Sequence, residues 1–258
     1  MSSSTASAIP PFFDSATGIL SAIGLNNVLI GLMIAGITGE ISVLLLVPIV
    51  NSAAVSLVNG LHYYDDIADH PALNKAVASV FKDLAWLIQE AGLVFYSYAL
   101  LICVLRGGER KVFLTLFWAL MLIIVVIKVT MMGMTGVRYY LNHSRAFSSA
   151  ADRPLHVGYY LTIAVVECVS AVFLLRKFWA GLRSSVSSPL KGGGLYRYLM
   201  RSTEIRVATI ALIGISRTAT YSFHTFGNTD ESWEGVSYEL DRFLYTMESL
   251  FPIIMLAG

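Results

Sequence analysis

The sequence predicts an all-α polytopic membrane protein with seven transmembrane helices, an outer N-terminus and a cytoplasmic C-terminus. Three observations predict this fold class. The 258 residues are 56% hydrophobic and only 14% charged, whereas charged residues make up about a quarter of a soluble domain. The chain divides into apolar segments of about 20 residues or more, the length that crosses a bilayer as a helix. Its Lys and Arg residues gather in alternate connections, as they do in oriented membrane proteins.

Seven apolar segments account for most of the chain. They lie at 16–37, 40–61, 77–105, 112–137, 157–178, 205–225 and 238–257. The first two are separated only by the Gly36-Ile37-Thr38-Gly39 stretch, so one long span preceded by an interfacial segment is the alternative there. Residues 1–14 are expected to form a flexible tail and residues 15–258 a single membrane domain, in which 179–204 is a basic, flexible cytoplasmic loop.

The charged connections predict the orientation. Basic residues follow the third and fifth segments, which places both connections in the cytoplasm: Arg106, Arg110, Lys111, Arg176, Lys177, Arg183, Lys191, Arg197, Arg201 and Arg206. The connections after the second and sixth segments are acidic and belong outside, with Asp65, Asp66, Asp69, Asp230, Glu231 and Glu234. An Asn142-His143-Ser144 glycosylation sequon falls outside in the same topology. This alternation requires two spans before Leu61, which favours seven.

Composition excludes several classes of function. The net charge of +1 gives no indication of nucleic-acid binding. P-loop, GxSxG, HExxH and CxxC motifs are missing, so this chain alone does not drive transport with ATP.

Cys103 and Cys168 lie in apolar segments and are expected to be buried, small apolar residues. Membrane lipids and a small apolar or amphipathic ligand are the expected partners. A cytoplasmic protein partner is left open, as is the choice between endoplasmic reticulum and plasma membrane.

Ionisable side chains inside the predicted spans are the main indication of a functional site. Such a residue is costly in lipid unless it faces a cavity or a partner. Asp83 and Glu90 lie seven residues apart, hence on one face of the third span, with Gln89 beside them. The later spans add Lys128, Glu167, Arg217, Asp241, Arg242 and Glu248. We expect these groups to line one cavity that opens outward, and interhelical pairs that only fix packing are the alternative.

The deepest charges are mostly acidic. Four carboxyls face only two cations, Lys128 and Arg217, so two carboxyls are expected to lack a cationic partner. An unpaired carboxyl in a dry site stays protonated near neutral pH, which suits a general acid or a proton-coupled carrier. The candidate acid or base groups are Asp83, Glu90, Glu167 and Glu248. The candidate ligand-binding residues are Lys128, Arg217, Gln89, Tyr96, Trp86, His224 and Asp241.

An acidic segment follows the second span. Asp65, Asp66 and Asp69 have the DDxxD spacing, which resembles the aspartate-rich motif of class I terpene synthases and membrane prenyltransferases. The resemblance would imply Mg²⁺ held against a diphosphate. No second motif of this kind accompanies it, and its expected outer location disagrees with a cytosolic diphosphate. A solvated acidic loop is therefore expected and no cofactor, with Mg²⁺ at this loop as the alternative. His62 and His70 extend that alternative to other metals.

The layout resembles that of rhodopsins and G-protein-coupled receptors, with departures at their motifs. No lysine follows Lys191, so the seventh span cannot form a retinal Schiff base. The third span ends in Cys103-Val104-Leu105-Arg106-Gly107 without an Asp-Arg-Tyr triplet, and Phe251-Pro252-Ile253 lacks the Asn-Pro-x-x-Tyr pattern. The resemblance implies the seven-helix layout and a receptor as one functional alternative.

A second resemblance lies near the C-terminus. The run Ile215-Ser216-Arg217-Thr218, followed by an acidic loop and then Tyr245 to Pro252, resembles the closing region of small fungal seven-span membrane proteins. Some multispanning fungal membrane proteins are terpene cyclases that protonate their substrates with intramembrane acids. A membrane-embedded acid–base enzyme of the cyclase or isomerase type is therefore the favoured expectation. A transporter and a receptor are the alternatives, although the chain has no evident internal repeat and lacks receptor motifs.

Overall fold

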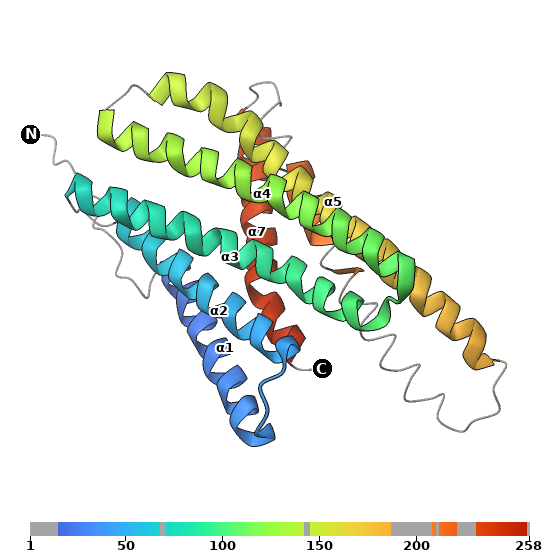
Figure 1. Ribbon diagram of the computed structural model, residues 1–258. Coiled ribbons are helices and arrows are strands. Elements are labelled where there is room, and N and C mark those ends of the chain that lie inside the picture. Colours follow the sequence, from blue (N-terminus) through green and yellow to red (C-terminus); the bar gives the residue numbers. More distant parts are fainter. Residues whose placement is uncertain are drawn as a thin grey trace, which may run out of the picture.

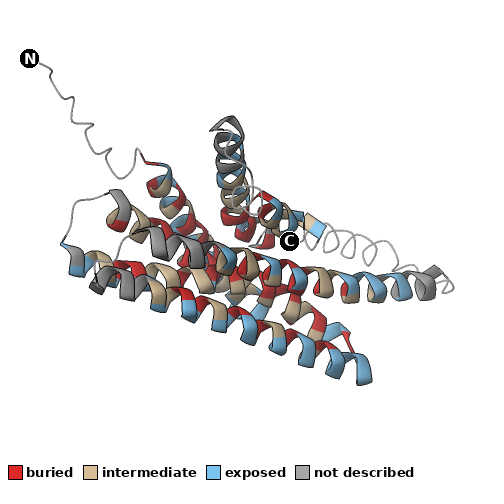
Figure 2. Cartoon of the chain, turned by 90° about the horizontal axis from the view of Figure 1, so that it is seen from above, coloured by how far each residue is buried: buried red, intermediate tan, exposed pale blue. Residues whose placement is uncertain are grey.

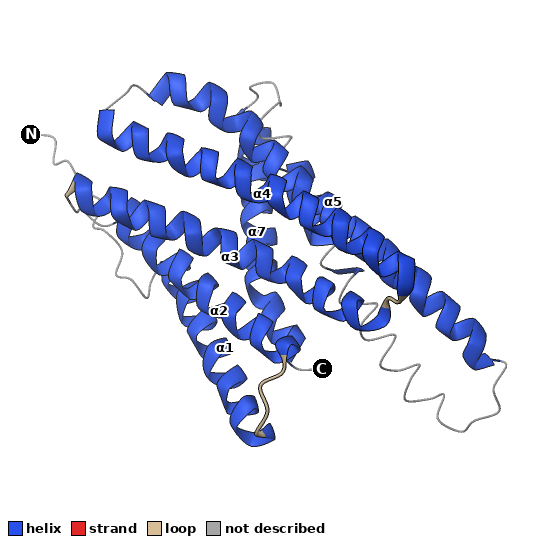
Figure 3. Ribbon diagram, in the orientation of Figure 1, coloured by secondary structure: helices blue, strands red, loops and turns tan. Residues whose placement is uncertain are grey.

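The computed structural model describes residues 15–67, 71–141, 145–186, 208–209, 212–220 and 231–256, and its elements there are all helices (Figures 1 and 3). This confirms the predicted all-α class. The helices are α1 (Ala16–Thr38), α2 (Val43–His62), η2 (Tyr63–Ile67, a π-helical turn), α3 (Ala72–Val104), α4 (Gly107–Leu141), α5 (Arg145–Val186) and α7 (Glu231–Leu256). Residues 212–220 are also helical.

Five helices are long and apolar enough to cross a membrane, which is compatible with a multi-pass membrane protein. The qualifying stretches are Ala16–Thr38, Val43–Asp65, Leu73–Val104, Gly107–Met134 and Pro154–Lys177. Helix α7 has 26 residues but is less apolar, because it carries Asp241, Arg242 and Glu248. The sixth predicted span is described only in part. The count of seven spans and the orientation of the termini stay predictions.

Helices α1 and α2 are separated by a turn at Gly39, so they are two helices and not one long span. Gly39 has a φ of 67°, in the left-handed region that favours glycine. Its N–H donates to the Ala35 carbonyl at 2.9 Å, which closes the last turn of α1. The Ser42 side chain then accepts from the Leu45 N–H and caps the start of α2. The break predicted at Gly36–Gly39 lies at 39–42, because α1 continues through Thr38.

Small residues let α1, α2 and α3 pack closely side by side (Figure 1). A Cβ added at Gly24 on α1 would lie 2.8 Å from the Ser52 carbonyl oxygen and 2.8 Å from the Ser56 nitrogen. A Cβ added at Gly92 on α3 would lie 2.7 Å from Oδ1 of Asn51. Close backbone approach at small residues is a common way to hold helices together in lipid.

An aromatic core joins α3, α4 and α5. The Tyr98 ring of α3 stacks on Phe117 of α4, with ring centroids 4.4 Å apart. Phe113 of α4 meets Phe173 of α5 at a centroid distance of 5.5 Å. Figure 2 shows that the outer faces of the long helices are exposed while the inner faces are buried. Those outer faces carry many large apolar side chains, which suits contact with lipid tails.

Three sequence expectations change at the ends of the helices. Helix α5 continues to Val186, so residues 179–186 of the expected flexible loop are helical, and the rest of the loop lies outside the described residues, as do the sequon and the tail. Cys103 is exposed near the end of α3, so its predicted burial is wrong, while Cys168 is half-buried. Asp65 is 4% exposed, and Lys82 Nζ lies 2.7 Å from its Oδ2. The expectation of a solvated acidic loop is therefore wrong for Asp65.

Candidate functional site

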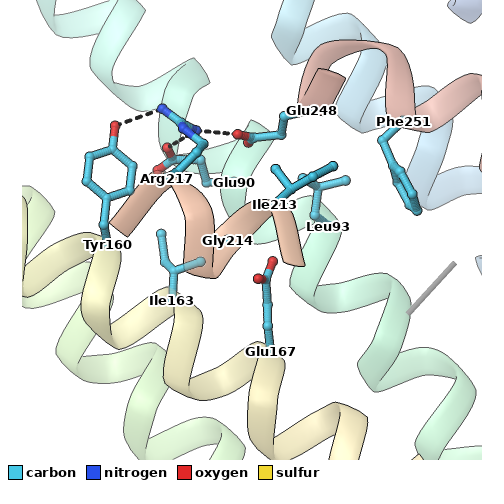
Figure 4. Close-up of a pocket in the computed structure, with 10 residues that line it drawn as sticks. All are labelled: Glu90, Leu93, Tyr160, Ile163, Glu167, Ile213, Gly214, Arg217, Glu248 and Phe251. Atoms are coloured by element: carbon cyan, nitrogen blue, oxygen red, sulfur yellow. Dashed lines mark hydrogen bonds and ion pairs between the residues drawn. The ribbon is translucent and has the colours of Figure 1, made fainter. Parts of the chain in front are cut away.

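Arg217 lies at the centre of a group of ionisable side chains from several helices. Its Nη1 is 3.5 Å from Oε1 of Glu90 on α3 and forms an ion pair with Glu248 on α7. Its Nε is 3.7 Å from Oδ1 of Asp241, also on α7. Its Nη2 donates to the Tyr160 hydroxyl of α5 at 3.1 Å. These five residues form what we call the Arg217 network, most of which is visible in Figure 4.

Two tyrosine rings complete the surroundings of the guanidinium. The Arg217 Cζ lies 4.8 Å from the ring centroid of Tyr160 and 5.6 Å from that of Tyr245. The Tyr245 hydroxyl accepts from Nδ2 of Asn59 on α2 at 3.0 Å, which ties α7 to α2. Arginine, with its planar fork of donors, suits such a site because it pairs with carboxylates and stacks on rings at once. Arg217 is only 4% exposed and is therefore held from several directions.

A second ion pair connects to this network through Trp86. Lys128 Nζ on α4 lies 3.1 Å from Oδ1 of Asp83 on α3, and 5.0 Å from the centroid of the Trp86 ring. The Trp86 Nε1 donates to Oε1 of Glu90 at 2.6 Å. The deep charges of α3, α4, α7 and residues 212–220 are therefore connected by direct contacts and do not form isolated pairs.

Two cavities flank Arg217, and both Arg217 and Tyr160 line each of them. The larger has a volume of about 560 Å³, which falls in the range of about 300–1,000 Å³ typical of small-molecule sites. Its apolar wall comes mainly from α1, and its polar floor includes Asn59, Trp86, Tyr160, Arg217, Asp241 and Tyr245. The smaller has a volume of about 20 Å³, which is room for about one water molecule.

The predicted single cavity is thus divided. Trp86, Arg217 and Asp241 line the larger cavity, whereas Glu90, Glu167 and Glu248 line the smaller one together with Arg217 (Figure 4). Asp83 and Lys128 pair with each other and line neither cavity.

Three further candidates lie elsewhere. Gln89 is fully buried, and its amide atoms have no hydrogen-bond partner in the described part of the chain. Tyr96 is packed in an apolar cluster with Leu93, Phe251 and Met255. Neither side chain lines the two cavities. His224 lies outside the described residues.

Sequence reasoning does not identify Tyr160, Tyr245 or Asn59 as members of the site. Tyrosines near the ends of spans are equally well explained by the aromatic belts of membrane interfaces. A usable signal is helical spacing, because Tyr245 lies four residues after Asp241 and three before Glu248 and therefore shares their face.

The charge balance leaves Glu167 apart from the other carboxyls. Lys128 forms an ion pair with Asp83, and Arg217 forms ion pairs with Glu90, Glu248 and Asp241. Among the described residues, Glu167 has no ion pair, and its Oε2 has no hydrogen-bond partner. The sequence predicts two carboxyls without a cationic partner. Among the described residues only Glu167 of the four lacks an ion pair, because Glu90 and Glu248 share Arg217.

The acidic segment after α2 has no built metal site within the described ranges. Asp65 forms an ion pair with Lys82. The side chain of Asp66 is not described, and Asp69 lies outside the described residues. Among the residues that the structure describes, no group of three or more His, Cys, Asp or Glu side chains is placed to hold a metal ion.

Comparisons with known proteins identify no relative: no family model, no curated protein and no solved structure matches the chain. The fold and the site define a helical protein compatible with multiple membrane passes, built around a buried arginine and a ligand-sized cavity.

Proposed function

We propose that this chain is a seven-span integral membrane protein, with its N-terminus outside, that binds a small apolar or amphipathic molecule and converts it by acid–base chemistry, as cyclases and isomerases do. The observation that carries the proposal is the cavity of about 560 Å³, in which an apolar wall faces a floor of ionisable and aromatic groups. Ligand sites commonly combine a mostly apolar lining with a few well-placed polar groups.

The lining gives the ligand an orientation. Ile19, Leu20 and Ile23 of α1 offer contact to an apolar body. The polar end of the ligand lies on the floor near Arg217 and Tyr245. The Tyr245 hydroxyl lies on this floor and accepts a hydrogen bond from Nδ2 of Asn59.

The lining supplies aromatic rings and one carboxyl for the proposed chemistry, beside the cations Lys82, Arg217 and Arg242. Protonation of an apolar substrate creates positive charge, which the faces of aromatic rings and nearby carboxylates stabilise. The rings of Trp86, Tyr160 and Tyr245 line the cavity, and Asp241 brings a carboxyl to its wall with a side chain that is 35% exposed. Glu90 and Glu248 lie behind Arg217, so they act on the ligand through the field of the Arg217 network.

A proton-coupled transporter is the second candidate, because the Arg217 network lies between two cavities. In a carrier, such a layer of ion pairs would rearrange to expose the ligand to the other side. Uptake of the ligand into liposomes without a change in its mass would support transport, and a product of new structure would support the enzyme.

Filling the cavity is expected to remove the ligand. Ile23→Trp places an indole on the cavity wall, whereas Leu29→Trp adds the same side chain on an exposed face of α1. We expect wild type and Leu29→Trp to retain a co-purifying small molecule and Ile23→Trp to lose at least about tenfold in affinity, or about 1.4 kcal/mol. Native mass spectrometry with lipid extraction measures this retention. Equal retention by all three proteins would contradict the assignment of the cavity.

The seven-span topology is tested by labelling single cysteines in a variant whose Cys103 and Cys168 are replaced by serine. A membrane-impermeant maleimide is expected to label Asn74→Cys and Asp230→Cys from outside and Arg110→Cys only after permeabilisation, because acidic connections stay outside and basic ones inside. Position 230 is decisive, since a protein whose spans are α1 to α5 alone would place it inside. Protection of Asp230→Cys in intact cells would refute the seven-span count.

A further inference from the structure

Basic side chains outnumber acidic ones around the larger cavity. Asp241 is the acidic residue of its lining. The basic residues of the lining are His62, Lys82, His156, Arg217 and Arg242. The ion pairs that already exist in the protein decide which of these basic groups remains for a ligand.

Carboxyls of the protein already compensate two of the three Lys and Arg side chains in the lining. Lys82 Nζ lies 2.7 Å from Oδ2 of Asp65. Arg217 forms ion pairs with the three carboxyls of the Arg217 network, which include the one acidic residue of the lining. Arg217 is therefore not the group that holds a further anion.

Arg242 differs from these two cations. Its side chain is exposed and lines the cavity, and among the described residues it has no ion pair. It lies three residues before Tyr245 on α7, so both side chains share the face that lines the cavity. A guanidinium binds a carboxylate or a phosphate well, because its planar fork donates two parallel hydrogen bonds. The cavity thus offers one uncompensated cation to a ligand.

Other basic residues lie at the same end of the cavity as Arg242. Helices α3 and α5 begin at the end of the bundle where α2 ends (Figure 1). Helix α7 runs in the same direction as α3, since Tyr245 meets Asn59 near the end of α2 and Phe251 packs with Val47 near its start. Four basic residues each lie one helical turn nearer this end than another lining residue of the same helix: His62 with Asn59, Lys82 with Trp86, His156 with Tyr160, and Arg242 with Tyr245. Groups that can bind an anion are therefore concentrated at one end.

The wall of the cavity along α1 is apolar. Ile19, Leu20 and Ile23 line it from α1, and Val58 adds an apolar side chain from α2. Burial of an apolar body against such a wall is favourable in proportion to the area removed from water. A ligand that matches both parts of the lining combines an apolar body with one anionic end.

We propose that the ligand of the larger cavity is an anionic amphiphile, whose carboxylate or phosphate group binds Arg242 and whose apolar body lies along α1. Lys82 assists, because its ammonium has three donors and remains able to bind a ligand oxygen beside Asp65. The inference rests on the proposed binding of a small amphipathic molecule and names the chemical class of that molecule. Fatty-acid-type carboxylates and lipid phosphates share this chemistry, so the experiment includes both.

Equilibrium binding of radiolabelled dodecanoic acid to the purified full-length protein in phosphatidylcholine nanodiscs tests the class of ligand. The buffer is alkaline, so the acid is ionised. Unlabelled dodecyl phosphate, dodecanol, dodecyltrimethylammonium and inorganic phosphate compete for the site. We expect both dodecyl anions to bind at least about tenfold more tightly than the alcohol and the ammonium compound, because only the anions form a charge-assisted pair with Arg242.

The competition also identifies the source of the anion. The tighter of the two dodecyl anions shows whether the site prefers a carboxylate or a phosphate. Inorganic phosphate that competes as well as dodecyl phosphate would show a site for a free anion and would overturn the amphiphile. Dodecanol that binds as tightly as dodecanoic acid would overturn the anionic class.

Variants of Arg242 test the residue that holds the anion. Arg242→Gln is expected to bind dodecanoic acid at least about tenfold more weakly and dodecanol as wild type does, which also checks that the cavity is intact. Arg242→Lys keeps the charge and is expected to retain most of the affinity. Lys75→Gln is the matched control, because Lys75 is a partly exposed cation in the first turn of α3 that does not line the cavity. Equal losses in Arg242→Gln and Lys75→Gln, or no loss in Arg242→Gln, would contradict the proposal.

The outcomes distinguish this inference from the proposed function. If Ile23→Trp loses dodecanol and dodecanoic acid alike and wild type binds them equally, the cavity stands as the ligand site and only the anionic class fails. If Ile23→Trp binds dodecanoic acid as tightly as wild type, the cavity is not the site and both fail. The binding assay needs no turnover, so the anionic class is decided whether or not a product is found.

Discussion

Replacing Arg217 by methionine is expected to lower the free energy of unfolding by about 3–5 kcal/mol, because it leaves buried carboxylates without their cation. Glu90 and Glu248 are 3% and 5% exposed, so water cannot replace the guanidinium at either group. The substitution also removes the hydrogen bond to Tyr160. Reversible unfolding in mixed detergent micelles, followed by circular dichroism, measures the change.

Two further variants of this network identify the cause. Arg242→Met removes an exposed arginine that, like Arg217, lines the larger cavity. It is expected to lower the free energy of unfolding far less than Arg217→Met does. The double variant Arg217→Met with Glu248→Leu removes both members of an ion pair and is expected to recover part of the loss, since an apolar pair replaces a buried carboxylate. A loss in Arg217→Met no larger than that in Arg242→Met would show that the Arg217 network does not stabilise the fold.

Replacing Lys128 by methionine is expected to lower the free energy of unfolding by about 1–3 kcal/mol, because Asp83 loses its hydrogen-bonded partner. The Lys128 side chain is 4% exposed and that of Asp83 is 18% exposed, so solvent compensates Asp83 in part. The ammonium also lies over the Trp86 ring and 5.5 Å from the centroid of Tyr159, and both of these contacts are lost.

The ion pair between Lys128 and Asp83 predicts how a variant that lacks both charges behaves. Lys128→Met with Asp83→Asn removes both charges and is expected to be more stable than Lys128→Met alone. Lys111→Met is the matched control, since Lys111 is exposed near the start of the same helix. If the double variant loses the sum of the two single losses, the two residues are not coupled and the proposed pairing is wrong.

The sequence by itself determined where five long apolar helices lie and which residues within the apolar segments are exceptional. Apolar length predicts a spanning helix because a bilayer has a fixed thickness, and the five candidate spans follow the predicted segments closely. The turn near Gly39 was predictable because glycine adopts the left-handed conformation without strain. Ionisable residues such as Glu90, Glu167 and Arg217 stand out in apolar segments for the same energetic reason that makes them rare there.

Only the tertiary structure decided which of these residues meet. Periodicity places Asp83 and Glu90 on one face of α3, but the neighbours of that face depend on how each helix is rotated and how the helices cross. Those angles follow from side-chain packing, such as the close approach of α1 to α2 at Gly24, which a hydropathy pattern does not contain. Packing therefore assigned Lys128 to Asp83 and Arg217 to Glu90 and Glu248, and it left Glu167 without a cation among the described residues.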